Sequence, residues 1–197
     1  MRFPFIVIHE RLAKVTCLAI VAWGIFCLAG PSPTQAAGET PTEYQVKAAF
    51  LFNFAKFVDW PPEKFSAQDS PLVIGILGED PFGTVLDAVV QKKSINNRPL
   101  LVRRLSAAED SKQCHILFIS RSEKAHLGPL LDALKSQAVL TVGETERFAQ
   151  QGGMINFVLV NESVKLEINA NAAGTAGLKI RSNLLSLAKI INTEGTR

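Results

Sequence analysis

Few residues in this sequence have the types and the spacing that catalysis or metal binding requires. Beyond residue 36 the chain has two histidines, His115 and His126, and a single cysteine, Cys114. Their spacing does not match a zinc-binding pattern, and the sequence has no G-x-S-x-G elbow, H-E-x-x-H motif or P-loop. His115 begins an apolar segment, where a hydrogen-bonded structural role is the commoner one. The sequence therefore predicts no enzyme, no cofactor and no metal.

One turn could bind an anion. The segment LGEDPFG (77–83) follows an apolar run and places Pro81 at the expected start of a helix. Backbone amides at such a position can bind anions, but the glycine pattern of a dinucleotide-binding loop is missing. The sequence therefore does not favour nucleotide binding.

A second group of residues suggests recognition. Glu167 lies on the polar face of a predicted strand, and Lys179 and Arg181 follow on the next segment. These charges form either a surface ion pair worth about 0–1 kcal/mol or a polar ligand pocket or partner contact. Pairing across a two-residue turn places Ile155 opposite Ile168 and beside Glu167. We expect Ile155, Glu167, Lys179 and Arg181 to border one groove, because apolar anchors ringed by charge are typical of binding hot spots.

Alternating strands and helices must position these residues. Apolar runs predict strands at 71–78, 98–105, 114–120 and 138–143, with helices from Glu79–Pro81 to Val90 and over 122–136. A hairpin is expected from 152–160 and 163–169, then a short helix at 170–176 and a helix at 183–191 capped by Ser182. The predicted fold class is α/β, a single domain with a mixed, mostly parallel sheet flanked by helices and a C-terminal β-hairpin and helix.

The segment 43–60 has no glycine or proline and holds six of the fifteen aromatic residues in the chain, five of them from Phe50 to Trp60. Wound as a helix, it is apolar over most of its circumference, with Lys47 and Lys56 on the polar side. We expect it to anchor the core and to leave part of its apolar surface for a partner. Its charges exclude a membrane span.

The first 36 residues read as a secretory signal peptide, with a basic start, sixteen uncharged residues (15–30) and a cleavage site near Ala36. We expect export to the periplasm, a flexible start at 37–42, one domain at 43–192 and a tail at 193–197. Removing three basic residues and one acidic residue leaves 18 basic and 17 acidic residues, so the sequence does not indicate nucleic-acid binding. Cys114 then remains as a lone thiol, expected to be buried and inert.

Five separated motifs carry a family resemblance. They are FNFAKFVDWP (52–61), ILGEDPFG (76–83), CHILFIS (114–120), GGMINFV (152–158) and VKLEINANAAGTAGLKIRSNLLSLAKI (164–190). In this order they resemble the YfiR-like family of periplasmic regulators. The resemblance implies an inhibitor that binds the periplasmic domain of an inner-membrane diguanylate cyclase and lowers cyclic-di-GMP signalling in biofilm and motility control. It also implies a homodimer and sequestration by an OmpA-like outer-membrane lipoprotein.

Two departures from the family concern cysteines. Relatives often carry a cysteine at the position of Gly75 that pairs with one at the position of Cys114, and a second pair near the GGM segment, where Gln150, Gln151 and Asn156 stand here. Redox sensing is therefore not expected of this chain. Two other functions stay open, a small ligand-binding sensor domain for a different membrane protein and a small periplasmic enzyme. A two-lobed solute-binding protein would need about twice this length.

Overall fold

The computed structural model describes residues 42–192. The expected signal peptide, nearly all of the flexible start and the tail lie outside the described residues. The α-helices are α2 (Glu43–Phe57), α3 (Thr84–Val90), α4 (Leu127–Leu134), α5 (Ala170–Thr175) and α6 (Ser182–Leu185). The strands are β1 (Val58–Asp59), β2 (Leu72–Leu77), β3 (Ser94–Ile95), β4 (Arg98–Leu105), β5 (Ile116–Ile119), β6 (Leu140–Gly143), β7 (Ile155–Val160), β8 (Ser163–Ile168), β9 (Lys179–Ile180) and β10 (Ala188–Ile190). Short 3₁₀ helices span Pro62–Lys64, Ala108–Gln113 and Arg121–His126.

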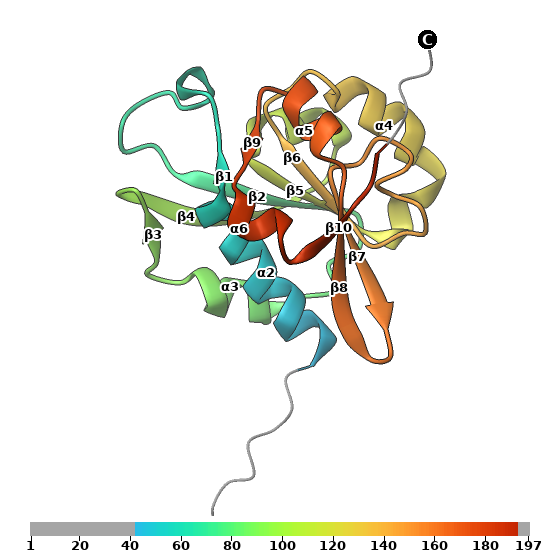
Figure 1. Cartoon of the computed structure of the whole chain (residues 1–197). Coiled ribbons are helices and arrows are strands. Elements are labelled where there is room, and N and C mark those ends of the chain that lie inside the picture. The colour runs from blue at the N-terminus through green and yellow to red at the C-terminus, as the bar shows by residue number, and fades with distance from the viewer. Residues whose placement is uncertain (1–41, 193–197) are drawn as a thin grey trace, which may run out of the picture. The chain divides into compact units, whose positions relative to one another are not determined.

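Eight of these strands form one sheet in the order β10-β8-β7-β6-β5-β2-β4-β3 (Figure 1). Only the β7–β8 and β3–β4 pairs are antiparallel. The predicted α/β class with a mostly parallel sheet is therefore confirmed. Strand β2 has β4 on one side and β5 on the other. Strands β3 and β4 are therefore added on one side of β2, and β5 and β6 are added on the other side.

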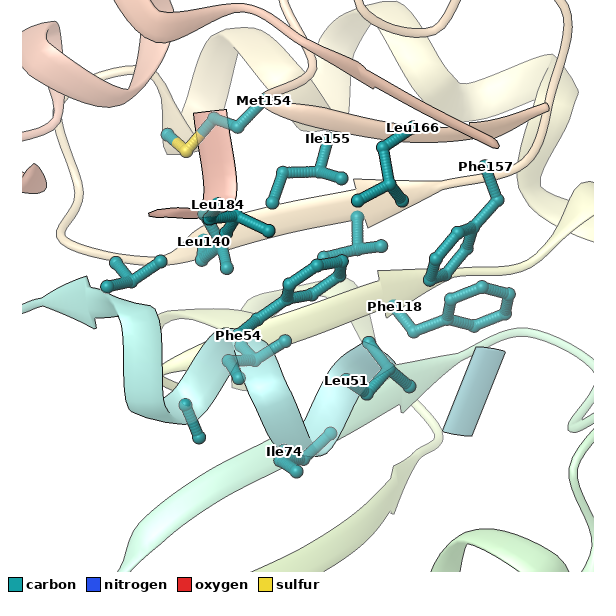
Figure 2. Close-up of a cluster of buried hydrophobic side chains, with 14 of the residues drawn as sticks. Leu51, Phe54, Ile74, Phe118, Leu140, Met154, Ile155, Phe157, Leu166 and Leu184 are labelled. Carbon is teal, nitrogen blue, oxygen red and sulfur yellow. The ribbon is translucent and has the colours of Figure 1, made fainter. Parts of the chain in front are cut away.

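Alternate side chains of the strands enter two separate apolar cores. Helix α2 packs Leu51 and Phe54 on one face of the sheet, against Ile74 and Phe118 (Figure 2). Helix α4 covers the other face with four leucines, Leu127, Leu130, Leu131 and Leu134. Because β2 is buried along its whole length, its sequence LVIGIL reads as a continuous apolar run, which is typical of a central parallel strand.

Helix α2 begins as its sequence dictates. Thr42 accepts a hydrogen bond from the amide of Gln45, and the Gln45 side chain accepts one from the amide of Thr42, which is a complete capping box. The helix ends at Phe57, before the Pro61–Pro62 pair, and Trp60 then donates a hydrogen bond of 3.1 Å from Nε1 to the carbonyl of His115. The predicted anchoring role of this helix is confirmed by its buried residues.

Two helix predictions were wrong. The helix expected to begin at Glu79–Pro81 begins at Thr84. The residues before it form a turn instead, because the Asp80 carboxylate accepts a hydrogen bond from the amide of Phe82. The helix expected over 183–191 is a single turn, α6, followed by edge strand β10. β10 pairs in parallel with β8, and Ala188 lies beside Leu166. Hydrogen bonding to the edge of the sheet therefore stabilises a strand in a segment whose local pattern favours a helix.

Candidate functional site

The β7–β8 hairpin has the register that the sequence predicted. Ile155 pairs with Ile168 and Asn156 with Glu167, and the two-residue turn is made by Asn161 and Glu162, both with positive φ (47° and 60°). Two consecutive left-handed residues are typical of the tight turns that suit the twist of a hairpin. Glu167 therefore points to the opposite face of the sheet from Ile155 and Ile168.

Ile155 itself lies in the core. It is 0 % exposed and packs in the same cluster as Phe54, Phe157 and Leu166 (Figure 2). A side chain in this position cannot border an exposed groove, so the structure corrects the part of the expectation that used Ile155 as an accessible anchor. The reason is that α2 covers this face of the hairpin, which the sequence alone did not show.

Glu167 is half-buried on the other face. One of its carboxylate oxygens lies 3.0 Å from Nζ of Lys189 on β10, and the other accepts a weak 3.5 Å hydrogen bond from Gln150. The Lys189 side chain is largely exposed, so this pair is open to solvent on one side. Surface pairs of this kind contribute little to folding, about 0–1 kcal/mol, and so leave the charges available for recognition.

Lys179 and Arg181 lie elsewhere, beside the exit of α2. Strand β9 pairs with β1, which places Lys179 opposite Asp59. Arg181 binds the Asp59 carboxylate, with Nη2 at 2.6 Å and Nε at 3.2 Å, and this hydrogen-bonded contact lowers the pKa of Asp59. The four residues singled out from the sequence therefore occupy three places, and no contact joins Lys179 or Arg181 to Glu167.

The sequence reasoning missed the exposed apolar residues at the end of the hairpin. Strand β6 pairs with β7 only up to Asn156, so the rest of the hairpin extends beyond the sheet as a two-stranded ribbon (Figure 1). Leu159 is 51 % exposed and Val160 45 % exposed on this ribbon. The signal was present in the sequence, because the run VLV (158–160) is apolar on both faces of a strand that should bury one.

A buried group of charges closes the carboxyl end of β6, where ligands usually bind in α/β sheets. Glu144 follows this strand and binds the ammonium of Lys47, which is 2 % exposed and also contacts Glu43. Tyr44 donates a 3.3 Å hydrogen bond to Glu144, and Arg121 lies 3.3 Å from it. Lys47 was expected on the polar side of its helix. Its partner is 97 residues away in the sequence, which a helical pattern cannot reveal.

The LGEDPFG turn is likewise occupied by the protein's own side chains. Arg104 on β4 lies 2.9 Å from Asp80 and 2.6 Å from Asp87. The amide of Glu79 donates to the hydroxyl of Ser122, at 3.0 Å, and Asp80 accepts from the amide of Phe82. Two amide donors of this turn, those of Glu79 and Phe82, are therefore used within the fold.

His115 has the structural role that the sequence favoured. Its Nδ1 accepts a 3.1 Å hydrogen bond from the amide of Val73, and its ring stacks on Phe65 with centroids 4.5 Å apart. Burial and, more weakly, the charges of Lys64 and Arg98 lower the pKa of His115 to about 4. Within residues 42–192 no group of three or more His, Cys, Asp or Glu residues is placed to hold a metal ion.

Comparison with known proteins identifies the family of this chain. A family model described as YfiR/HmsC-like matches residues 44–189. The chain belongs to the YfiR/HmsC-like family. Members of this family are periplasmic regulators rather than enzymes. No curated protein matches the sequence.

Solved structures resemble this YfiR/HmsC-like chain in fold only. A conserved domain protein from Vibrio cholerae O1 biovar El Tor is 11 % identical, with a TM-score of 0.51, over 77 % of this chain and 60 % of that one. The ABC domain in complex with L-Trp from Streptococcus pneumoniae is 10 % identical, with a TM-score of 0.44, over 60 % of this chain and 55 % of that one. The chain thus spans less than two thirds of either structure. Among its described helices, none is long and apolar enough to cross a membrane.

Proposed function

We propose that this protein is a periplasmic inhibitor of an inner-membrane diguanylate cyclase and that it binds the periplasmic domain of the cyclase. The observation that carries the proposal is the family match over residues 44–189. In this proposal residues 1–36 are a signal peptide removed near Ala36, the protein is a homodimer, and an OmpA-like outer-membrane lipoprotein sequesters it to release the cyclase.

The β7–β8 hairpin is the proposed contact with the cyclase. Leu159 and Val160 supply exposed apolar surface at the end of the ribbon, and Val160 shares a face with Glu167, which with Lys189 supplies charge farther along the hairpin. The ribbon also has unpaired strand edges beyond Asn156, which can accept an extended segment of a partner. Apolar residues ringed by charge are the usual composition of an interface hot spot.

The test measures cyclic-di-GMP in cells that lack the gene and carry a plasmid copy of each variant. Leu159→Asp and Glu167→Lys should each raise cyclic-di-GMP relative to the wild-type copy. Their melting temperatures should stay within a few degrees of wild type, because neither residue is in the core.

The matched control is Leu101→Asp, since Leu101 on β4 is 40 % exposed and lies on the far side of the sheet order from the hairpin. This variant should repress as well as wild type. Wild-type repression by both hairpin variants would remove the hairpin from the interface. A gene deletion that leaves cyclic-di-GMP unchanged, in cells that express an inner-membrane diguanylate cyclase, would contradict the inhibitory function itself.

A further inference from the structure

A cleft of about 440 Å³ lies between α4 and the segment that joins β8 to α5. Four of its lining residues are almost fully buried and form its floor: Leu134, Thr141, Met154 and Asn169. Exposed residues of the lining form its rim, among them Gln151 and Asn171. Small-molecule sites commonly have volumes of roughly 300–1,000 Å³, so the cleft is large enough for a ligand of one or two sugar rings.

The walls of the cleft are held in place before any ligand arrives. The Asn169 side chain donates to the carbonyl of Ala149 at 2.9 Å and accepts from the amide of Ala172 at 3.0 Å. The hydroxyl of Thr141 accepts from the amide of Met154 at 3.1 Å. Binding to such a preformed site does not require the ordering of a loop.

Glycines fix the loop that forms one wall. Gly152 has φ of +101°, a conformation that other residues rarely adopt. A side chain on Gly153 would collide with the ring of Phe148, which is itself 0 % exposed. The GGM motif is therefore explained by the close approach of this loop to the core, which holds Gln151 and Met154 at the cleft.

The lining is polar but close to neutral. Carboxamides and hydroxyls, from Gln150, Gln151, Asn171 and Thr175, both donate and accept hydrogen bonds, as the hydroxyl groups of a sugar do. The charged residues of the lining are one acid, Asp132, and one base, Lys135, so no basic cluster selects a phosphate. Leucines of α4 and Met154 offer apolar surface to the C–H groups of a ligand, and the lining has no aromatic ring on which a base could stack.

We propose that this cleft is a binding site for a small neutral saccharide, a mono- or disaccharide. The proposal does not rest on the inhibition of a cyclase, because it is argued from the lining of the cleft, which adjoins the hairpin where Gln150 donates to Glu167. Neutral hydroxyl groups match the lining better than an anion or a planar aromatic ligand does. Binding can therefore be measured on the purified protein alone.

The experiment is a calorimetric titration of the purified protein with maltose and with N,N′-diacetylchitobiose. L-alanine and inorganic phosphate are the comparison ligands. We expect saturable binding of at least one disaccharide and none of either comparison ligand. The double variant Gln151→Ala/Asn171→Ala should weaken binding by about tenfold or more, since it removes two exposed hydrogen-bonding side chains.

The control variant is Asn183→Ala, which removes another exposed carboxamide, from α6, outside the cleft. It should bind the disaccharide as wild type does. The absence of binding by either disaccharide at millimolar concentration would overturn the proposal. Equal affinity in the double variant would overturn the location, and binding of phosphate or L-alanine in place of the sugars would overturn the ligand class.

Discussion

At the scale of single residues, His115 makes stability depend on pH. The imidazole is buried, its Nδ1 accepts from the amide of Val73, and the pKa is about 4, below the ordinary value of 6.5. Between pH 6.5 and 4 the unfolded chain binds a proton that the folded chain does not, so the folded state loses stability as pH falls through this window. The full loss is on the order of 3 kcal/mol.

The first prediction follows from this residue. His115→Asn should flatten the pH dependence of the free energy of unfolding between pH 6.5 and 4, measured by urea denaturation at several pH values. His126→Asn, at a largely exposed histidine, is the control and should keep the wild-type slope. An unchanged slope in His115→Asn would assign the pH dependence to other groups.

Cys114 gives a second prediction at this scale. The thiol is free and fully buried, and burial raises its pKa to about 11, so it should be unreactive. A side chain on Gly75 would meet the Cys114 sulfur directly. Gly75→Cys should therefore form a disulfide with Cys114 and stabilise the oxidised protein by about 3–4 kcal/mol, as expected for a closed loop of about 40 residues.

The measurement is thiol titration together with melting temperatures in the presence and absence of reductant. Wild type should show no effect of reductant. Gly75→Ser, which adds a side chain without a crosslink, should melt below wild type because Cys114 must move. Two free thiols in oxidised, folded Gly75→Cys would show that the two positions do not meet as described.

At the scale of elements, the ion pair between Lys47 and Glu144 attaches α2 to the end of β6. Both side chains are almost completely buried. Glu144→Gln should lower the unfolding free energy by about 1–3 kcal/mol, because the buried ammonium of Lys47 loses one of its two carboxylate partners and keeps Glu43. The double variant Lys47→Met/Glu144→Leu removes both charges and should be more stable than Glu144→Gln. Urea denaturation measures the unfolding free energy of both variants. A loss of unfolding free energy below about 1 kcal/mol in Glu144→Gln would mean that water reaches Lys47.

Elements with strong local patterns could be predicted from the sequence. The capping box of α2, the strand at 98–105 and the register of the hairpin all follow from local residue types and turn length. What could not be predicted depends on distant partners. The segment from Ser186 onward has a helical pattern, yet residues Ala188 to Ile190 form a strand that pairs with β8. Ile155 has the residue type of an anchor, yet α2 covers it.

At the scale of the whole molecule, the strand order decides which site residues meet. Local patterns identify strands but do not say that β2 lies between β4 and β5, or that β9 leaves the main sheet to pair with β1. That pairing places Lys179 and Arg181 beside Asp59 and away from Glu167. The charges expected to form one groove therefore belong to two separate surfaces, and each needs its own test.

The last prediction concerns the second of these surfaces. Arg181→Glu breaks the exposed ion pair with Asp59 and should shift the melting temperature by only a few degrees. If the cyclase contacts the β1–β9 ribbon as well as the hairpin, this variant should raise cyclic-di-GMP in cells. The double variant Asp59→Arg/Arg181→Glu restores an ion pair with its charges exchanged. Recovery of repression in the double variant would show that the pair acts only by joining β1 to the segment after β9. Continued loss of repression in the double variant would show that a partner contacts the positive charge of Arg181. Wild-type repression by Arg181→Glu would exclude this ribbon from the interface.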